Sequence, residues 1–143
     1  MGYVTQSTLA ATLIAIGETA IAQEDDVALR EYFASEYVLH LPGTDIDFLT
    51  LRNYFAALRA AFDDFAVTRA LIIGEGRYLA ARTIFSGVFA RAFMHPSAGE
   101  LQPTGTYVEW EVMNIFRYAD DDRLAEEWVQ SDSRLFLQKL GAG

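Results

Sequence analysis

The amino-acid sequence predicts one α+β domain over residues 1–143, in which helices cover one face of a curved antiparallel sheet. Three observations support this class. Hydrophobic residues make up 52% of the 143-residue chain, helical periodicity is confined to its first half, and long strand-like segments fill its second half. Helices followed by consecutive strands are typical of α+β domains. Because helices cover only part of a curved sheet's concave face, we expect an enclosed pocket lined mainly by apolar and aromatic side chains.

Two helices are expected before the first strand. The first runs to about Ala22, with Thr5 or Ser7 as its N-cap, because apolar residues recur there at helical spacing. Its hydrophobic stripe comprises Leu9, Leu13, Ile16 and Ala20. The second helix is expected over residues 24–34, since its acidic first turn suits the helix dipole. A short strand over residues 36–41 then ends at Pro42.

A third helix is the clearest element of the sequence. Asp45 or Asp47 is the expected cap, and Asp63 marks the end. Apolar residues recur at spacings of three and four. They are Phe48, Leu51, Phe55, Leu58 and Phe62.

The second half reads as strands with a short closing helix. Gly87 is the expected site of a bulge in the second and longest strand. A loop with two prolines should separate that strand from the next. The expected strands cover residues 65–73, 77–93, 106–118 and 123–132, the loop covers 95–105, and the helix covers 134–140.

Composition narrows the classes of partner. The net charge of −9 and the lack of basic clusters argue against nucleic acid and anionic membranes. Without cysteine, disulfides, thiolate metal sites and a cysteine nucleophile are excluded, and two separated histidines argue against a metal site. No basic residue precedes the apolar run near the N-terminus, so it does not read as a signal peptide. We therefore expect a cytoplasmic protein that crosses no membrane.

Several stretches resemble one known family. They are residues 37–43, 58–65, 80–87, 103–105, 114–117 and 126–132, with a Leu- and Gln-containing end at 135–141. In order and spacing the chain resembles the SnoaL-like polyketide cyclase (ester cyclase) family, within the nuclear-transport-factor-2-like superfamily. The resemblance implies a cone-shaped α+β barrel, frequent homodimers, and aldol ring closure of polyketide esters by a carboxylic acid/base without a cofactor. Relatives isomerise compounds or hydrolyse epoxides.

The last strand carries the first candidate site. Trp128, Gln130 and Asp132 share one face of it, since side chains alternate along a strand. The resemblance implies that this face turns toward the pocket. Asp132 would then be a desolvated acid/base near Trp128, with a raised pKa. The alternative is that Asp132 caps the final helix.

Two basic residues are further catalytic candidates. His40 is either a general base at the pocket mouth or a structural histidine. Arg82 lies in mid-strand, where a charge is costly unless it is paired. It would hold Asp132 ionised or bind a substrate carbonyl; alternatively it forms a structural ion pair with Glu109, Glu111 or Glu127.

The strand over residues 106–118 supplies expected substrate contacts. In the preferred register Trp110 and Asn114 line the pocket, while Glu109 and Glu111 face solvent. A bulge would exchange the two faces and make Glu111 the rival acid. Tyr37 would donate a hydrogen bond to a substrate carbonyl, or only pack. Phe89 makes the pocket more apolar, at a place where the family often carries a histidine.

The sequence therefore predicts a cofactor-independent cyclase or isomerase for polyketide-like or other apolar carbonyl compounds. One alternative is a non-catalytic module that binds an apolar ligand with the same fold. A second is an epoxide hydrolase, but Gln130 stands where those relatives would carry an acid. The fold alone does not select among them.

Overall fold

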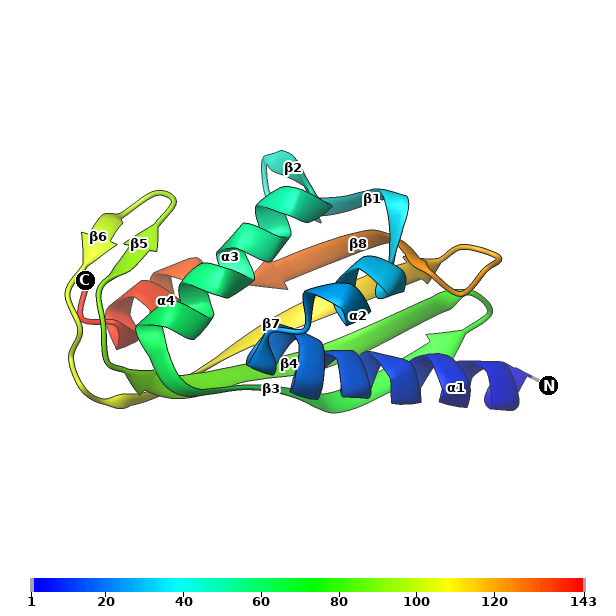
Figure 1. Cartoon of the computed structure of the whole chain (residues 1–143), viewed down its shortest axis with the longest axis horizontal. Helices are drawn as coiled ribbons and strands as arrows, with labels where there is room; N and C mark the ends of the chain where they lie inside the picture. Colours follow the sequence, from blue (N-terminus) through cyan, green and yellow to red (C-terminus); the bar gives the residue numbers. More distant parts are fainter. Residues whose placement is uncertain (1, 143) are drawn as a thin grey trace.

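A six-stranded sheet forms one layer of the molecule, and helices cover its concave face (Figure 1). The computed structural model describes residues 2–142, with side chains from residue 8 onward. The helical elements are α1 (Gly2–Ala15), the π-helical segment η1 (Ile16–Ile21), α2 (Asp26–Tyr32), α3 (Phe48–Ala61) and α4 (Ser133–Lys139). The strands are β1 (Phe33–Leu41), β2 (Thr44–Asp47), β3 (Phe62–Glu75), β4 (Tyr78–Phe89), β5 (Phe93–His95), β6 (Gly99–Leu101), β7 (Tyr107–Tyr118) and β8 (Leu124–Ser131).

The strand order in the sheet is β2-β1-β8-β7-β4-β3. Each neighbouring pair is antiparallel except β1 and β8, which run parallel with His40 opposite Trp128. The antiparallel expectation therefore holds for the sheet apart from this one pair. A parallel pair needs a long crossover connection, and here all of the chain between β1 and β8 forms it.

The N-terminal helix buries the predicted stripe. Leu9, Leu13, Ile16 and Ala20 are all buried. The helix begins at Gly2, so neither Thr5 nor Ser7 is its cap, and the side chains of both lie outside the described residues. After Ala15 the helix widens into η1, which packs on β3. The sequence offered no sign of this wider turn.

Aspartates begin the next two helices. Asp25 accepts a hydrogen bond from the backbone N–H of Ala28, and Asp47 accepts one from that of Thr50. Of the two expected caps for α3, Asp47 is the one used. Asp45 instead lies in β2, a short strand that the sequence analysis did not predict.

Two expected boundaries in the second half are wrong. The strand expected over residues 77–93 is broken: β4 ends at Phe89 and β5 starts at Phe93. The expected loop contains part of a two-stranded hairpin, in which Phe93 pairs with Leu101. The chain leaves the line of β4 after Phe89 because the N–H of Ala90 and the N–H of Arg91 both donate to the carbonyl of Ala61 at the end of α3. β7, β8 and α4 match their predictions within about one residue.

The predicted bulge lies opposite Gly87 rather than at it. The register of β3 and β4 shifts between Asp63 and Ala66, and Asp64 takes a left-handed backbone conformation with φ of 55°. Gly87 faces this bulge, and a Cβ there would lie 2.9 Å from the Cβ of Phe62. Only a residue without a side chain fits, so the glycine allows the two strands to bend together.

Apolar and aromatic side chains fill the space between the helices and the sheet. Phe62 packs on Phe89 with ring centroids 5.2 Å apart, and Trp110 packs on Phe136 at 4.6 Å. Full burial of one such side chain stabilises the fold by about 1.5–3 kcal/mol. The second of these contacts attaches α4 to the inner face of the sheet.

Gly87→Ala should destabilise the domain by about 1–3 kcal/mol, because the new methyl group overlaps Phe62 and the carbonyl of Asp63. Urea unfolding followed by circular dichroism measures the change. Ser86→Ala, the neighbouring position of the same strand, is the control and should change stability by less than about 0.5 kcal/mol. Equal stability of the Gly87→Ala variant and the parent would contradict the close approach.

Candidate active site: a polar row across the concave face

Five polar side chains form a hydrogen-bonded row across the otherwise apolar concave face. Adjacent strands β3, β4, β7, β8 and β1 each contribute one residue. In that order they are Arg69, Thr83, Asn114, Glu127 and Tyr37. We call this set the polar row.

Every hydrogen bond of the row points toward the carboxylate of Glu127, three of them in sequence from the guanidinium of Arg69 and one from Tyr37 on the other side. Arg69 Nη1 donates to Thr83 Oγ1 at 2.9 Å, and Thr83 Oγ1 donates to Asn114 Oδ1 at 2.8 Å. Asn114 Nδ2 then donates to Glu127 Oε2 at 2.9 Å. Tyr37 donates to the other carboxylate oxygen, Oε1, at 2.8 Å. Glu127 thus accepts at both oxygens, the arrangement that suits its ionised form.

Strand alternation explains why these side chains meet. Phe65, Val67 and Arg69 follow each other on the inner face of β3, and Thr83 lies directly opposite Arg69 on β4. Asn114 is on the inner face of β7, with buried neighbours two residues away on each side. The row therefore follows from the same alternation that buries the apolar core.

Burial dominates the electrostatics of the row. It raises the pKa of Glu127, whose residue is only 7% exposed, against the lowering effects of Tyr37, Asn114 and the charge of Arg69. Burial likewise lowers the pKa of Arg69 and, together with the nearby carboxylate, raises the pKa of Tyr37. A carboxyl group in such surroundings can accept or release a proton closer to neutral pH than an exposed one.

Two tyrosines lie close to the row. The hydroxyl groups of Tyr32 on α2 and Tyr118 on β7 are hydrogen-bonded to each other. Burial raises the pKa of both, so they remain neutral. The guanidinium of Arg69 lies 5.5 Å from the ring centre of Phe116, a cation–π contact.

A hollow of about 370 Å³ opens beyond the end of β8, beside β7 and α4. It brings together three predicted site residues, Trp110, Gln130 and Asp132, with Phe136 and Lys139. Trp110 and Asn114 lie on the same face of β7, four residues apart, or roughly 13 Å along the strand. The hollow therefore lies at the end of the sheet, and no residue of the polar row lines it.

Four predicted residues face inward as expected. Trp110 and Asn114 are buried in β7, while Glu109 and Glu111 are exposed, so the preferred register is confirmed. Tyr37 is buried against Glu127. Phe89 is fully buried in the aromatic core.

The prediction that Trp128, Gln130 and Asp132 face inward from β8 is wrong. Ala125 and Glu127 are buried, whereas Gln130 and Asp132 are exposed. Trp128 lies on the outer face, stacked on His40 with ring centroids 5.2 Å apart. Register decides this, because a shift of one residue turns every side chain to the other face.

Asp132 has the alternative role that the sequence analysis weighed. It is the N-cap of α4, and its Oδ1 accepts a hydrogen bond from the backbone N–H of Leu135 at 2.9 Å. It lies at the rim of the hollow rather than beside Trp128 in a desolvated interior.

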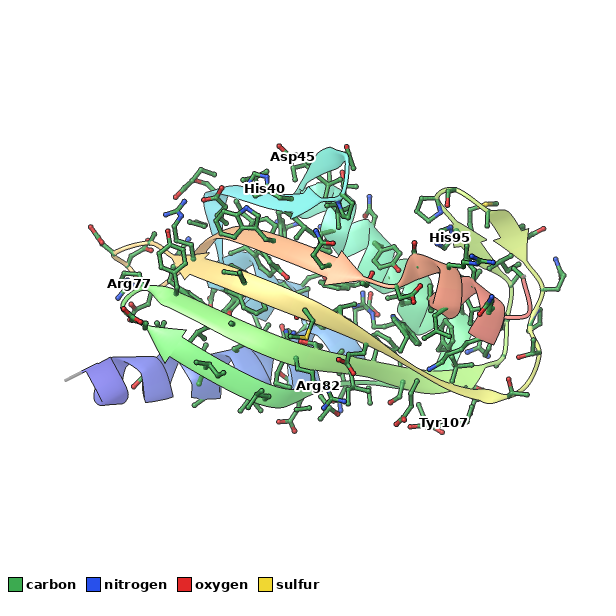
Figure 2. The ribbon with its side chains drawn as sticks, turned by 180° about the vertical axis from the view of Figure 1, so that it is seen from behind. His40, Asp45, Arg77, Arg82, His95 and Tyr107 are labelled. Atoms are coloured by element: carbon green, nitrogen blue, oxygen red, sulfur yellow. The ribbon has the colours of Figure 1, made fainter. Side chains whose placement is uncertain are left out.

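His40 and Arg82 lie on the outer face of the sheet (Figure 2). Arg82 forms an ion pair with Glu111 at 2.9 Å, which confirms the structural alternative for this residue. His40 binds Asp45 through Nδ1 at 2.8 Å and Glu126 through Nε2 at 2.6 Å. These hydrogen bonds to Glu126 and Asp45 raise the pKa of His40. The side chains of His40 and Arg82 are both held by partners on the outer face, so neither reaches the concave face.

Glu127 and Arg69 were not predicted from the sequence as members of a site. The available signal for Arg69 was its place two residues after Val67 in an alternating strand. For Glu127 the signal was ambiguous, since Glu126 and Glu127 are adjacent and either could have been the inward one.

No group of three or more His, Asp or Glu side chains among the described residues is arranged to hold a metal ion. No helix among the same residues is long and apolar enough to span a membrane.

The stability that His40 contributes should depend on pH. Both partners are carboxylates, so both ring nitrogens donate and the imidazole is charged. Its folded-state pKa lies above the ordinary value of 6.5. The contribution is therefore complete below about pH 6.5 and is lost as the pH rises through the folded-state value.

Urea unfolding of the parent and of His40→Gln at pH 6 and pH 9 tests this: the parent's advantage should be larger at pH 6. His95→Gln is the matched control, because burial lowers the pKa of His95 and its contribution should not fall as the pH rises. If the parent is more stable than His40→Gln by the same amount at both pH values, His40 is not stabilised as a charged imidazole between Asp45 and Glu126.

Comparisons with known proteins agree with this structure. The sequence profile of the SnoaL-like polyketide cyclase family matches residues 15–140. IdmH from Streptomyces antibioticus, a candidate polyketide cyclase, is 29% identical with a TM-score of 0.76, over 95% of this chain and 98% of that one. No curated protein is similar enough to count as a match.

More distant solved structures share the fold. A candidate SnoaL-like polyketide cyclase from Jannaschia sp. is 15% identical with a TM-score of 0.79, covering 96% of this chain and 94% of its own. A protein of ketosteroid isomerase-like fold from Catenulispora acidiphila, bound to trimethylamine, is 14% identical with a TM-score of 0.67, covering 94% and 93%. With the profile match over nearly the whole sequence, the chain belongs to the SnoaL-like polyketide cyclase family.

Proposed function

We propose that this protein is a cofactor-independent cyclase or isomerase that acts on an apolar, polyketide-like carbonyl compound, with Glu127 as its acid/base. The observation that carries the proposal is a buried carboxyl group in an apolar concave face, hydrogen-bonded to Tyr37 and Asn114. Carboxyl groups whose pKa is shifted by burial and by specific partners are concentrated at functional sites. Membership of a cyclase family is consistent with this chemistry.

The proposed reaction begins with proton removal next to a carbonyl. The Glu127 carboxylate takes the proton from carbon, the C–H electron pair forms a new C=C bond, and the π pair of the carbonyl moves onto its oxygen, giving an enolate. In a cyclisation the enolate carbon attacks a second carbonyl of the same molecule. The resulting alkoxide takes the proton back from the Glu127 carboxyl, so the net reaction needs no other reagent.

The neighbours of Glu127 would tune each step. While the carboxylate is ionised, Tyr37 and Asn114 hold it in place by donating to its two oxygens. Once Glu127 has taken the proton, the Tyr37 hydroxyl can rotate and accept a hydrogen bond from it. The aromatic walls around Trp110 and Phe136 favour flat, apolar substrates entering from the hollow.

Asp132 is the competing candidate for the acid/base, because the family resemblance implies that role for it. It lies at the rim of the same hollow and is exposed, where it accepts the hydrogen bond that starts α4. We favour Glu127 because a solvated carboxylate is a weak base, whereas burial makes the carboxylate a stronger one.

Exchange of the α-protons of 2-tetralone in D₂O, followed by NMR, isolates the proton-removal step. Glu127→Gln should lower the protein-catalysed exchange by about 10²- to 10⁴-fold, the usual contribution of a general base. Asp132→Asn is the matched control and should stay within about threefold, provided circular dichroism shows both variants folded. The reverse pattern would make Asp132 the base, and binding of the ketone without exchange would favour the non-catalytic binding module.

We also propose that the protein forms a homodimer through the outer face of its sheet. Half-exposed apolar side chains lie side by side there in two cross-strand rows, since Leu71 and Met113 flank Arg82 and Ile73 and Ile115 flank Ala80. Contiguous exposed apolar surface of this kind is typical of protein interfaces.

Ile115→Glu should convert the proposed dimer to a monomer, because it places a charge in the middle of this surface. Sedimentation equilibrium measures the molecular mass of each form. Val27→Glu, an exposed apolar position on α2, serves as the control and should leave the dimer intact. A monomeric parent protein at all concentrations would disprove the proposal.

A further inference from the structure

Thr83 is the wholly buried link of the polar row between Arg69 and Asn114. Its Oγ1 accepts a hydrogen bond from Arg69 Nη1 at 2.9 Å and donates one to Asn114 Oδ1 at 2.8 Å. The other end of the same amide, Asn114 Nδ2, donates to Glu127 Oε2 at 2.9 Å. Thr83 is therefore linked to the candidate acid/base through Asn114.

The direction of this chain of hydrogen bonds follows from the chemistry of its first member. A guanidinium carries donors only, so the Thr83 oxygen accepts from Arg69 and its single proton remains for Asn114. That proton requires the oxygen of the Asn114 amide. The amide nitrogen is then left to face Glu127, where it can only donate.

The orientation of the amide determines which oxygen of Glu127 can carry a proton. A proton on Oε2 would lie against the N–H of Asn114, which is a donor and not an acceptor. Oε1 faces the hydroxyl of Tyr37, which can rotate and accept. When Glu127 is protonated, both of its oxygens are satisfied only with the proton on Oε1.

Turning the Asn114 amide over would remove this restriction. Its oxygen would then accept from a proton on Oε2, which would stabilise the neutral acid of Glu127. The Thr83 oxygen would receive two donors, while its own buried proton would lose the acceptor that it has now. An unpaired buried hydroxyl is costly, so Thr83 and Arg69 together oppose the turned orientation.

We propose that Thr83 is a positioning residue of the candidate active site. Anchored by Arg69, it holds the Asn114 amide in one orientation. That orientation directs the catalytic proton to Oε1 of Glu127, the oxygen beside Tyr37. The catalytic part of this role rests on the proposed function, in which Glu127 is the base, but the orientation can be tested without turnover.

No other group near Glu127 among the described side chains should titrate together with it. The ionisable neighbours besides Arg69 are Tyr32, Tyr37 and Tyr118, and burial raises the pKa of all three hydroxyl groups. They stay neutral, and the guanidinium stays charged, while the carboxyl group titrates. A change in its titration midpoint therefore reports on the hydrogen bonds that it makes.

Carboxyl ¹³C NMR of protein labelled at the side-chain carboxyl carbon of glutamate follows this titration directly, and Glu127→Gln identifies the signal. Thr83→Val keeps the shape of the side chain and removes the hydroxyl. The midpoint should rise by about 1–2 pH units, because the carboxylate loses a fixed donor and the neutral acid gains an acceptor.

Three further variants control for packing and folding. Thr83→Ser retains the hydroxyl and should keep the parent midpoint. Val112→Ala is the matched packing control, since Val112 is buried directly opposite Thr83 on β7 and its side chain makes no hydrogen bond; it should also keep the parent midpoint. Thr83→Ala, which also lacks the hydroxyl, takes the place of Thr83→Val if circular dichroism shows that the latter is unfolded.

Asn114→Leu decides whether Thr83 acts through the amide. In that background Thr83→Val should no longer move the midpoint, since no amide remains to be turned. An equal rise with and without the amide would overturn the positioning role, because the hydroxyl would then act on the carboxyl group by another route. An unchanged midpoint in Thr83→Val, or an equal rise in Thr83→Ser, would overturn it as well.

The pH profile of 2-tetralone proton exchange separates this inference from the proposed function. If Glu127 is the base, the profile of Thr83→Val should shift to higher pH together with the NMR midpoint. A shifted midpoint with an unshifted exchange profile would refute Glu127 as the base and would still support the positioning of its proton by Thr83.

Discussion

The burial of one carboxylate, Glu127, constrains the whole concave face. An ion taken out of water must be compensated, and here the compensation reaches it through side chains from four other strands. The donors are arranged in one direction from Arg69, and such chains of hydrogen bonds strengthen one another. The five strands must therefore keep their register to within one residue. A slip at β8 would bury Trp128 in place of Glu127 and leave Asn114 and Tyr37 without an acceptor.

The apolar parts of the fold could be predicted because their sequence periods are strong. The stripe of α1, the Asp47 cap of α3 and the limits of β7 all follow from local patterns. What could not be predicted is set by distant contacts. The parallel pairing of β1 with β8 and the break after Phe89 depend on residues that lie far away in the chain.

The candidate site shows the same limit more sharply. Trp110 and Asn114 were placed correctly, because a long alternating strand leaves only two choices of face and the tryptophan indicates the inner one. On β8 that reasoning failed. Trp128 is only partly buried and its ring is stabilised outside the core by stacking on His40, so an aromatic residue was a poor guide to the inner face. A tryptophan identifies the core only where no other partner on the outer surface can cover it.

The parallel pairing of β1 with β8 also has a consequence for how the protein is made. Tyr37 and Glu127 are 90 positions apart in the chain, so their hydrogen bond can form only when nearly all of the polypeptide has left the ribosome. Contacts of such long sequence separation slow folding, because the loop that they close is costly in entropy. Until β8 arrives, Tyr37 and Asn114 have no carboxylate to bind. The complete site therefore assembles in one late step, and a truncated or nascent chain cannot present part of the chemistry early.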